Sequence, residues 1–328
     1  MRARTITIRP RSLLVVHGSG FKPPADKLQD MVAAALRAGI ERDYPEQLHS
    51  YDEMAVRLAY YGDLNNALLG EPGRAYDEQI DLADRLNALQ NLRSLDARKR
   101  FGIRQYDCLP GKTAVPEFLA SIITPLCGVL RMTGLLLRRI VPDFAEYIDG
   151  NSDYAEKVRE RVRNALCALL DRGDRVMLVS HGTGCVVSYD ILWQLSHEPR
   201  FAAKYADAKV DNWVTLGAPL GDRSIRRYLL GNKGEPVTFP KNVIAWHNVA
   251  AEDDYICCDN TLADDFRHML QQRVVSAVQD YRIYNLAVRY GRSNPHSSVG
   301  YFIHPRMSKI IVDWVQSPVL ETDPTYIL

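Results

Sequence analysis

The chain has no excess of charge of either sign. Its 328 residues include 41 Lys and Arg against 40 Asp and Glu, so the formal net charge is +1. A strongly basic domain or face is the usual electrostatic feature of proteins that bind nucleic acid or anionic membranes. The overall composition therefore gives no reason to expect a nucleic-acid partner, and we predict none.

Cysteine is scarce and scattered. The six cysteines, at positions 108, 127, 167, 185, 257 and 258, have no spacing that suggests a zinc site or a disulfide framework. No helical two-histidine motif accompanies the Asp and His residues. We therefore predict no metal and no cofactor. The N-terminal stretch MRARTITIRPRSLLVVHG also lacks a cleavable apolar region, so a reduced, cytoplasmic location is expected.

Long apolar runs are absent as well. The most apolar stretch, FLASIITPLCGVLRMTGLLLRRIV at 118–141, is interrupted by Pro125, Arg131 and the pair Arg138–Arg139. No apolar span reaches the 18 residues expected of a membrane-crossing helix. We expect residues 114–141 to pack as helices of a cap over a binding cleft. Contact of this apolar face with a membrane surface is the second interpretation.

What the sequence does contain is an alternation of strand-like and helix-like segments. Compact apolar runs predict strands, and 3.6-residue periodicity predicts helices. The strand candidates are 12–17, 56–61, 176–179, 213–216 and 243–249, and the clearest helices are 27–38 and 155–170. This alternation predicts an α/β fold, a mainly parallel sheet with helices on both faces. Residues 1–61 and 151–328 form the predicted core, and 62–150 an inserted, mostly helical cap.

The stretch LVSHGTGC, residues 178–185, follows one of these strands and precedes a helix. It resembles the nucleophile elbow G-x-S-x-G of the α/β-hydrolases in its lipase and esterase form. Ser180 stands at the first glycine of that pattern, Gly182 at the nucleophilic serine and Gly184 at the last glycine. Small residues suit a turn where strand and helix approach closely, but Gly182 supplies no oxygen.

Three other residues near the turn carry a nucleophilic side chain. A second register makes Ser180 the nucleophile, with Leu178 in place of the leading glycine. Thr183 and Cys185 follow the apex of the turn, and a lone buried cysteine is usually a small apolar side chain. We expect both of these to be structural.

Three further motifs, in the chain order that the α/β-hydrolase family requires, extend the resemblance to about residues 12–61 and 155–316. His-Gly-Ser-Gly at 17–20 resembles the loop that supplies an oxyanion N–H, which places the donors near Ser19 and at Thr183. The acidic loop after 243–249 implies Asp254 as the triad acid, with Asp253 as the alternative. The loop SNPHSSVGY at 293–301 implies His296 as the triad histidine.

We expect no catalytic role for the remaining histidines. His181 and His247 lie in or beside predicted strands and are expected to be structural. His17 is expected to line the cleft without moving a proton, and His304 falls where a helix should begin.

The resemblance implies hydrolysis of a small apolar or acyl ester, but the nucleophilic oxygen is missing at Gly182. Losing a nucleophile removes most of the rate, although the oxyanion hole and binding alone retain a part of it. Three hypotheses follow. The chain is a hydrolase that lost its serine or works through a neighbouring group, a non-catalytic relative that binds an acyl ligand, or a protein that recruits a partner through its cap.

Overall fold

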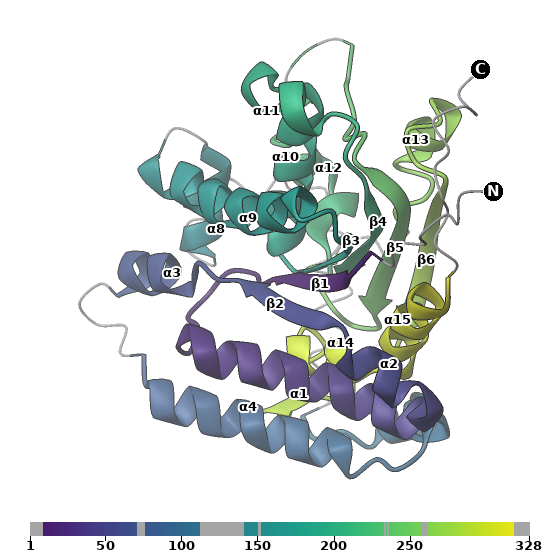
Figure 1. Ribbon diagram of the computed structural model, residues 1–328. Helices are drawn as coiled ribbons and strands as arrows, with labels where there is room; N and C mark the ends of the chain where they lie inside the picture. The colour runs from purple at the N-terminus through teal and green to yellow at the C-terminus, as the bar shows by residue number, and fades with distance from the viewer. Residues whose placement is uncertain are drawn as a thin grey trace, which may run out of the picture.

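A six-stranded, wholly parallel sheet forms the centre of the protein (Figure 1). The computed structural model describes residues 9–70, 76–111, 141–149, 152–232, 234, 236–257 and 261–317. The strands, in the spatial order of the sheet, are β2 (Ala55–Ala59), β1 (Arg11–Val16), β3 (Arg175–His181), β4 (Val210–Leu216), β5 (Val243–Ala251) and β6 (Ala277–Ile283). A short antiparallel pair, β7 (Val288–Arg289) and β8 (Arg292–Ser293), lies outside this sheet.

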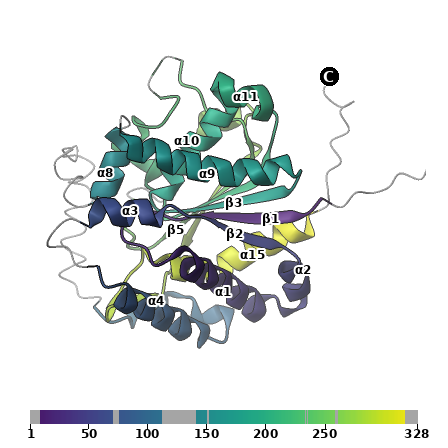
Figure 2. The ribbon, with the colours of Figure 1, turned by 60° about the vertical axis from the view of Figure 1, so that its left-hand side comes forward.

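Helices cover both faces of the sheet (Figures 1 and 2). One layer holds α1 (Ala25–Asp43), α2 (Leu48–Asp52), α4 (Glu78–Arg93), α14 (Ser298–Phe302) and α15 (Pro305–Gln316). The other holds α8 (Pro142–Asp149), α9 (Asp153–Asp171), α10 (Gly184–His197) and α11 (Pro199–Tyr205). Short helices complete the described part: α3 (Gly62–Leu69), α5 (Ile103–Asp107), α12 (Arg223–Arg226) and α13 (Arg267–Gln271). The predicted α/β architecture is confirmed.

Alternation along the central strands explains why both faces are covered. Leu13 and Val15 of β1 belong to the core under α1 and α15, whereas Leu14 and Val16 belong to the core under α9 and α10. Successive side chains of a strand point to opposite faces, so a strand that is apolar throughout needs two covering layers.

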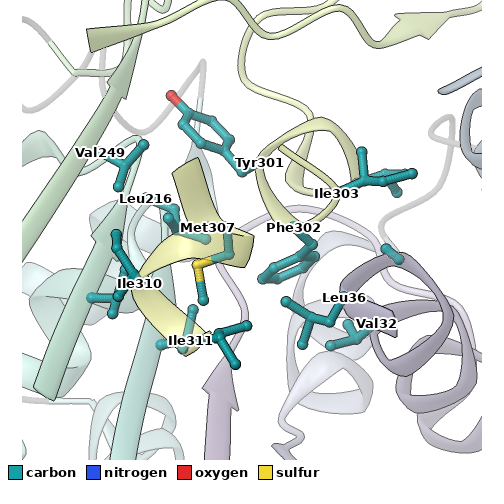
Figure 3. Packing of buried hydrophobic residues seen from close by; sticks show 14 of the residues in the cluster. Val32, Leu36, Leu216, Val249, Tyr301, Phe302, Ile303, Met307, Ile310 and Ile311 are labelled. Atoms are coloured by element: carbon teal, nitrogen blue, oxygen red, sulfur yellow. The ribbon is translucent and has the colours of Figure 1, made fainter. Parts of the chain in front are cut away.

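The core under α14 and α15 shows this packing closely (Figure 3). Met307 and Ile310 of α15 lie over Leu216 of β4 and Val249 of β5, and all four belong to one buried cluster. Burial of each such side chain contributes about 1.5–3 kcal/mol. This layer holds α14 in place, directly after the loop that carries His296.

The segment 62–150 contributes helices to both layers. Helix α4 packs against α1 and α14, and α8 packs against α9 and α3. Residues 112–140, which include most of the apolar stretch, lie outside the described residues. The division into a core and a cap therefore stays a prediction. Among the helices that are described, none is both long and apolar enough to cross a membrane.

The order of the strands determines where a ligand site is expected. From β1 the chain moves to β2 on one side and then returns to β3 on the other side of β1. The loops after β1 and β3 therefore leave a crevice between them at the carboxyl ends of the strands. In open α/β sheets, ligands bind at such a switch point.

Candidate active site

The tight turn after β3 places Gly182 at the carboxyl edge of the sheet. Strand β3 ends at His181 and α10 begins at Gly184, as the resemblance implied. Gly182 has a φ of +56°, a left-handed conformation that glycine adopts without steric cost. Its N–H donates to the carbonyl of Leu216 at 2.8 Å, which fixes the turn to the end of β4.

His296 and Asp254 meet beside this turn. The Nδ1 atom of His296 lies 2.9 and 3.0 Å from the two carboxylate oxygens of Asp254, although the residues are 42 positions apart. Because a carboxylate only accepts, Nδ1 carries the hydrogen, and in the neutral ring Nε2 keeps its lone pair. Gly217, at a φ of +59°, makes room for the pair, since a Cβ there would lie 2.7 Å from Oδ2 of Asp254.

Asp254 is held as a buried carboxylate. Its side chain is fully buried; Tyr301 Oη donates to it at 2.6 Å and the N–H of Ile256 at 3.1 Å. Burial by itself would raise the pKa of Asp254, but the neighbouring His296 and the hydrogen bonds from His296 and Tyr301 outweigh it and hold the pKa below its usual value. Asp254 is thus ionised and can orient His296.

The alternative acid, Asp253, does not face His296. It has a φ of +59° and accepts a hydrogen bond from Tyr106 Oη at 2.5 Å. The structure therefore brings Asp254, rather than Asp253, to the histidine.

Gly182 lies directly opposite the free edge of His296. A Cβ built on Gly182 would lie 2.8 Å from Nε2 and 3.2 Å from Cε1 of that ring. A side chain at residue 182 would therefore point at Nε2, the nitrogen that carries the lone pair in the neutral ring. The imidazole also stands so close that any such side chain would push it back by a few tenths of an ångström.

The two expected oxyanion residues lie together. The N–H of Ser19 donates to Thr183 Oγ1 at 2.7 Å, and the two hydroxyl oxygens are 2.6 Å apart. The Ser19 N–H is thus already engaged. The N–H of Thr183 has no hydrogen-bond partner within the described ranges.

Ser180 is oriented away from the pocket. It is fully buried; its Oγ donates to Ser188 Oγ at 2.7 Å and accepts from the indole N–H of Trp213 at 3.1 Å. These contacts describe a structural hydroxyl, and they do not bring it to His296.

Replacing Ser180 with alanine is accordingly expected to preserve turnover. The change leaves the Trp213 N–H without its partner, which costs about 1–3 kcal/mol of unfolding free energy. Urea unfolding and ester hydrolysis should be measured on the same preparation. A loss of turnover in a folded Ser180→Ala protein would instead make Ser180 the nucleophile.

The nearby histidines, His17 and His181, are neutral and are hydrogen-bonded to the backbone. The Nδ1–H of His17 donates to the carbonyl of Gly18 and its Nε2 accepts from the N–H of Tyr61; burial, with the charge of Lys22, lowers the pKa of His17 to about 3. His181 Nε2–H donates to the carbonyl of His296 at 2.9 Å. Burial and the neighbouring His296 hold the pKa of His181 well below its usual value.

A cavity of about 340 Å³ opens beside His296 and Thr183. Its apolar lining includes Leu28 and Val32 of α1 and Phe302 of α14. Two lining residues, Arg85 and Val141, come from the segment 62–150. The segment 62–150 thus forms part of the wall of this cavity.

Several lining residues were missed by sequence reasoning. Lys22, Arg85 and Arg289 line the cavity, and burial together with Arg85 lowers the pKa of Lys22 to about 7. Ser297, next to His296, could have been found from its position in the predicted histidine loop. Arg85, in the middle of α4, stands in no motif that would single it out.

No group of three or more His, Cys, Asp or Glu side chains suited to a metal ion is found among the described residues. The prediction that the protein needs no metal or cofactor stays a prediction. Comparisons of the chain with protein-family models, with curated proteins and with solved structures give no match.

Proposed function

We propose that this chain is an acyl-ester hydrolase of the α/β-hydrolase type in which His296 activates a water molecule instead of a serine hydroxyl. One observation carries the proposal. His296 is paired through Nδ1 with a buried carboxylate and directs Nε2 toward Gly182, beside a cavity. An oriented, partly exposed imidazole backed by an ionised carboxylate is the arrangement of a general base.

The reaction follows from these atoms. Nε2 of His296 takes a proton from water while the water oxygen bonds to the ester carbonyl carbon. The carbonyl oxygen gains the negative charge and accepts from the N–H of Thr183. The intermediate then breaks its bond to the alkoxide, which takes the proton from Nε2, so an acid and an alcohol leave. Asp254 stabilises the imidazolium between the two proton transfers.

Without a covalent intermediate, the expected acceleration is modest. General-base assistance contributes about 10²–10⁴-fold. The N–H of Ser19 adds a second oxyanion donor only if Thr183 Oγ1, its present acceptor at 2.7 Å, turns away.

A second candidate function is binding without catalysis. The engaged N–H of Ser19 favours it, because a working oxyanion hole presents free donors to the substrate. In that case the apolar side of the cavity would hold an acyl ligand, or the segment 62–150 would recruit a partner protein.

Matched substitutions at Gly182 test the proposal. Gly182→Ala adds only the Cβ, which would stand 2.8 Å from Nε2 and so would displace either the attacking water or the imidazole that activates it. We expect it to lower ester turnover at least tenfold. Gly182→Ser adds the same Cβ and a hydroxyl, and we expect it to give burst kinetics and covalent labelling by a phosphonate ester probe.

The reference for both variants is the unmodified protein, which should turn over esters without labelling. Turnover that is equal in the unmodified protein and Gly182→Ala would contradict a water held at this position. Absence of turnover in the unmodified protein would favour the binding function.

A further inference from the structure

The cavity beside His296 has a basic side that the proposed reaction does not use. Arg85 of α4 and Arg289 of β7 line it together with Lys22, and no Asp or Glu is among its lining residues. The two arginines are 204 positions apart in the sequence, and the fold alone brings them together.

Asp81 holds both guanidinium groups, and Asp84 holds that of Arg289 as well. Arg85 Nε donates to Asp81 Oδ2 at 2.8 Å, and Arg289 Nη2 donates to Asp81 Oδ1 at 2.7 Å. Arg289 Nε also donates to Asp84. Asp81 accepts a further hydrogen bond from Tyr76 Oη at 3.1 Å. Neither aspartate lines the cavity, so each arginine is anchored on its far edge.

The remaining edges of the two arginines have no hydrogen-bond partner within the described residues. These are Nη1 and Nη2 of Arg85 and Nη1 of Arg289. The side chains are only 13% and 8% exposed, yet none of these three nitrogens is fully buried, so they stay accessible where the arginines line the cavity. A ligand oxygen in the cavity can accept charge-assisted hydrogen bonds from them.

Ser297, the residue after His296, also lines this cavity. It is 5% exposed, and its Oγ is buried without a hydrogen-bond partner in the described part of the chain. Because a molecule of the size of water does not reach this oxygen, the two arginines, and not Ser297, point to a ligand.

We infer that the cavity binds an anionic ligand through a carboxylate or phosphate group held by Arg85 and Arg289. Guanidinium groups bind such groups with two parallel, charge-assisted hydrogen bonds. The inference deepens the proposed function, because it names the substrate class as an ester with an anionic group, and it rests on that function for the cleavage step alone. The apolar side chains of Leu28, Val32 and Phe302 contact the rest of the ligand.

Lys22 contributes charge without a direct bond. Its ammonium donates to the carbonyls of Ser19, Gly20 and Phe21, which uses all three of its hydrogens. It therefore holds the loop after β1, and below its pKa of about 7 it adds a positive potential to the cavity.

The test is calorimetric binding of inorganic phosphate and of acetate to the full-length protein. Arg85→Gln is expected to weaken binding of the preferred anion at least tenfold, because it removes the charge and the open fork. Arg159→Gln is the matched control: its side chain is 12% exposed and pairs with Glu156 one turn earlier on α9, away from the cavity. Equal weakening in both variants, or no binding of either anion to the unmodified protein, would overturn the inference.

The two probes distinguish the sources of the anionic group, since tighter phosphate binding indicates a phosphate-bearing ligand and tighter acetate binding a carboxylate. Hydrolysis separates this inference from the proposed function. Esters with a terminal carboxylate, a terminal phosphate and a neutral end of equal length should be compared in the unmodified protein and Arg85→Gln. Anion binding without turnover supports the inference and contradicts the function. Turnover that neither prefers an anionic ester nor responds to Arg85→Gln contradicts the inference alone.

Discussion

Replacing Asp254 with asparagine is expected to lower ester hydrolysis by about 10²–10⁴-fold, the whole contribution of the general base, while the protein stays folded. The carboxylate lies 2.9 Å from Nδ1 of His296, so it fixes the hydrogen on that atom and leaves Nε2 as the base. An asparagine that donates its amide hydrogen to Nδ1 reverses the tautomer, and Nε2 then loses its lone pair. Asparagine is nearly isosteric, so the cavity keeps its shape.

Tyr301→Phe is the matched control for Asp254→Asn. It removes the 2.6 Å hydrogen bond to the same carboxylate without changing the partner of Nδ1. We expect a loss of about tenfold or less in kcat/KM, since the base keeps its tautomer. The variant also leaves the buried N–H of Ala251 without its acceptor, Tyr301 Oη at 2.9 Å, which lowers the free energy of unfolding by about 1–3 kcal/mol. Urea unfolding should accompany both rate measurements. Equal rates in Asp254→Asn and the unmodified protein would remove His296 from the reaction.

Replacing Gly184 with alanine is expected to destabilise the protein by about 3 kcal/mol, at the upper end of overpacking effects. A Cβ at Gly184 would lie 2.4 Å from the carbonyl oxygen of His17 and 3.0 Å from that of Val16. These are backbone atoms at the end of a central strand, so they cannot move aside as a side chain would. The strain falls where β1 and α10 approach most closely.

Gly234→Ala is the control for this prediction, because a Cβ there would meet nothing within 4 Å. The free energies of unfolding of both variants should be measured in urea. A Gly184→Ala protein as stable as Gly234→Ala would show that the approach of strand and helix is looser than the structure has it.

The central strands and the candidate base were predictable because their signals are local. The run at 176–179 is apolar at every position, which fits a strand buried on both faces and flanked by parallel neighbours. The turn at Gly182 and the loop around His296 are each recognisable from a short motif in the sequence. The structure then adds the distance between His296 and Asp254, which no spacing along the chain contains.

Other features had no local signal. Strand β6, AVQDYRI, lies at the edge of the sheet and is mostly half-exposed, so it has no apolar run and was missed. The pairing of Arg85 and Arg289 through Asp81 depends on how α4 packs against β7. Ion-pair partners that lie far apart in the chain are brought together only by the tertiary fold, so a single sequence does not reveal them.

The position of β1 between β2 and β3 also has a consequence for how the protein folds. Ser19 and Thr183, which meet across the crevice, are 164 residues apart in the chain. During synthesis the loop after β1 must wait for β3 to emerge before it acquires its partner. Such long-range pairing makes parallel sheets slow to form and leaves strands unpaired in the meantime. Until β3 pairs with it, β1 exposes backbone N–H and C=O groups along one edge, together with the apolar side chains of residues 13–16.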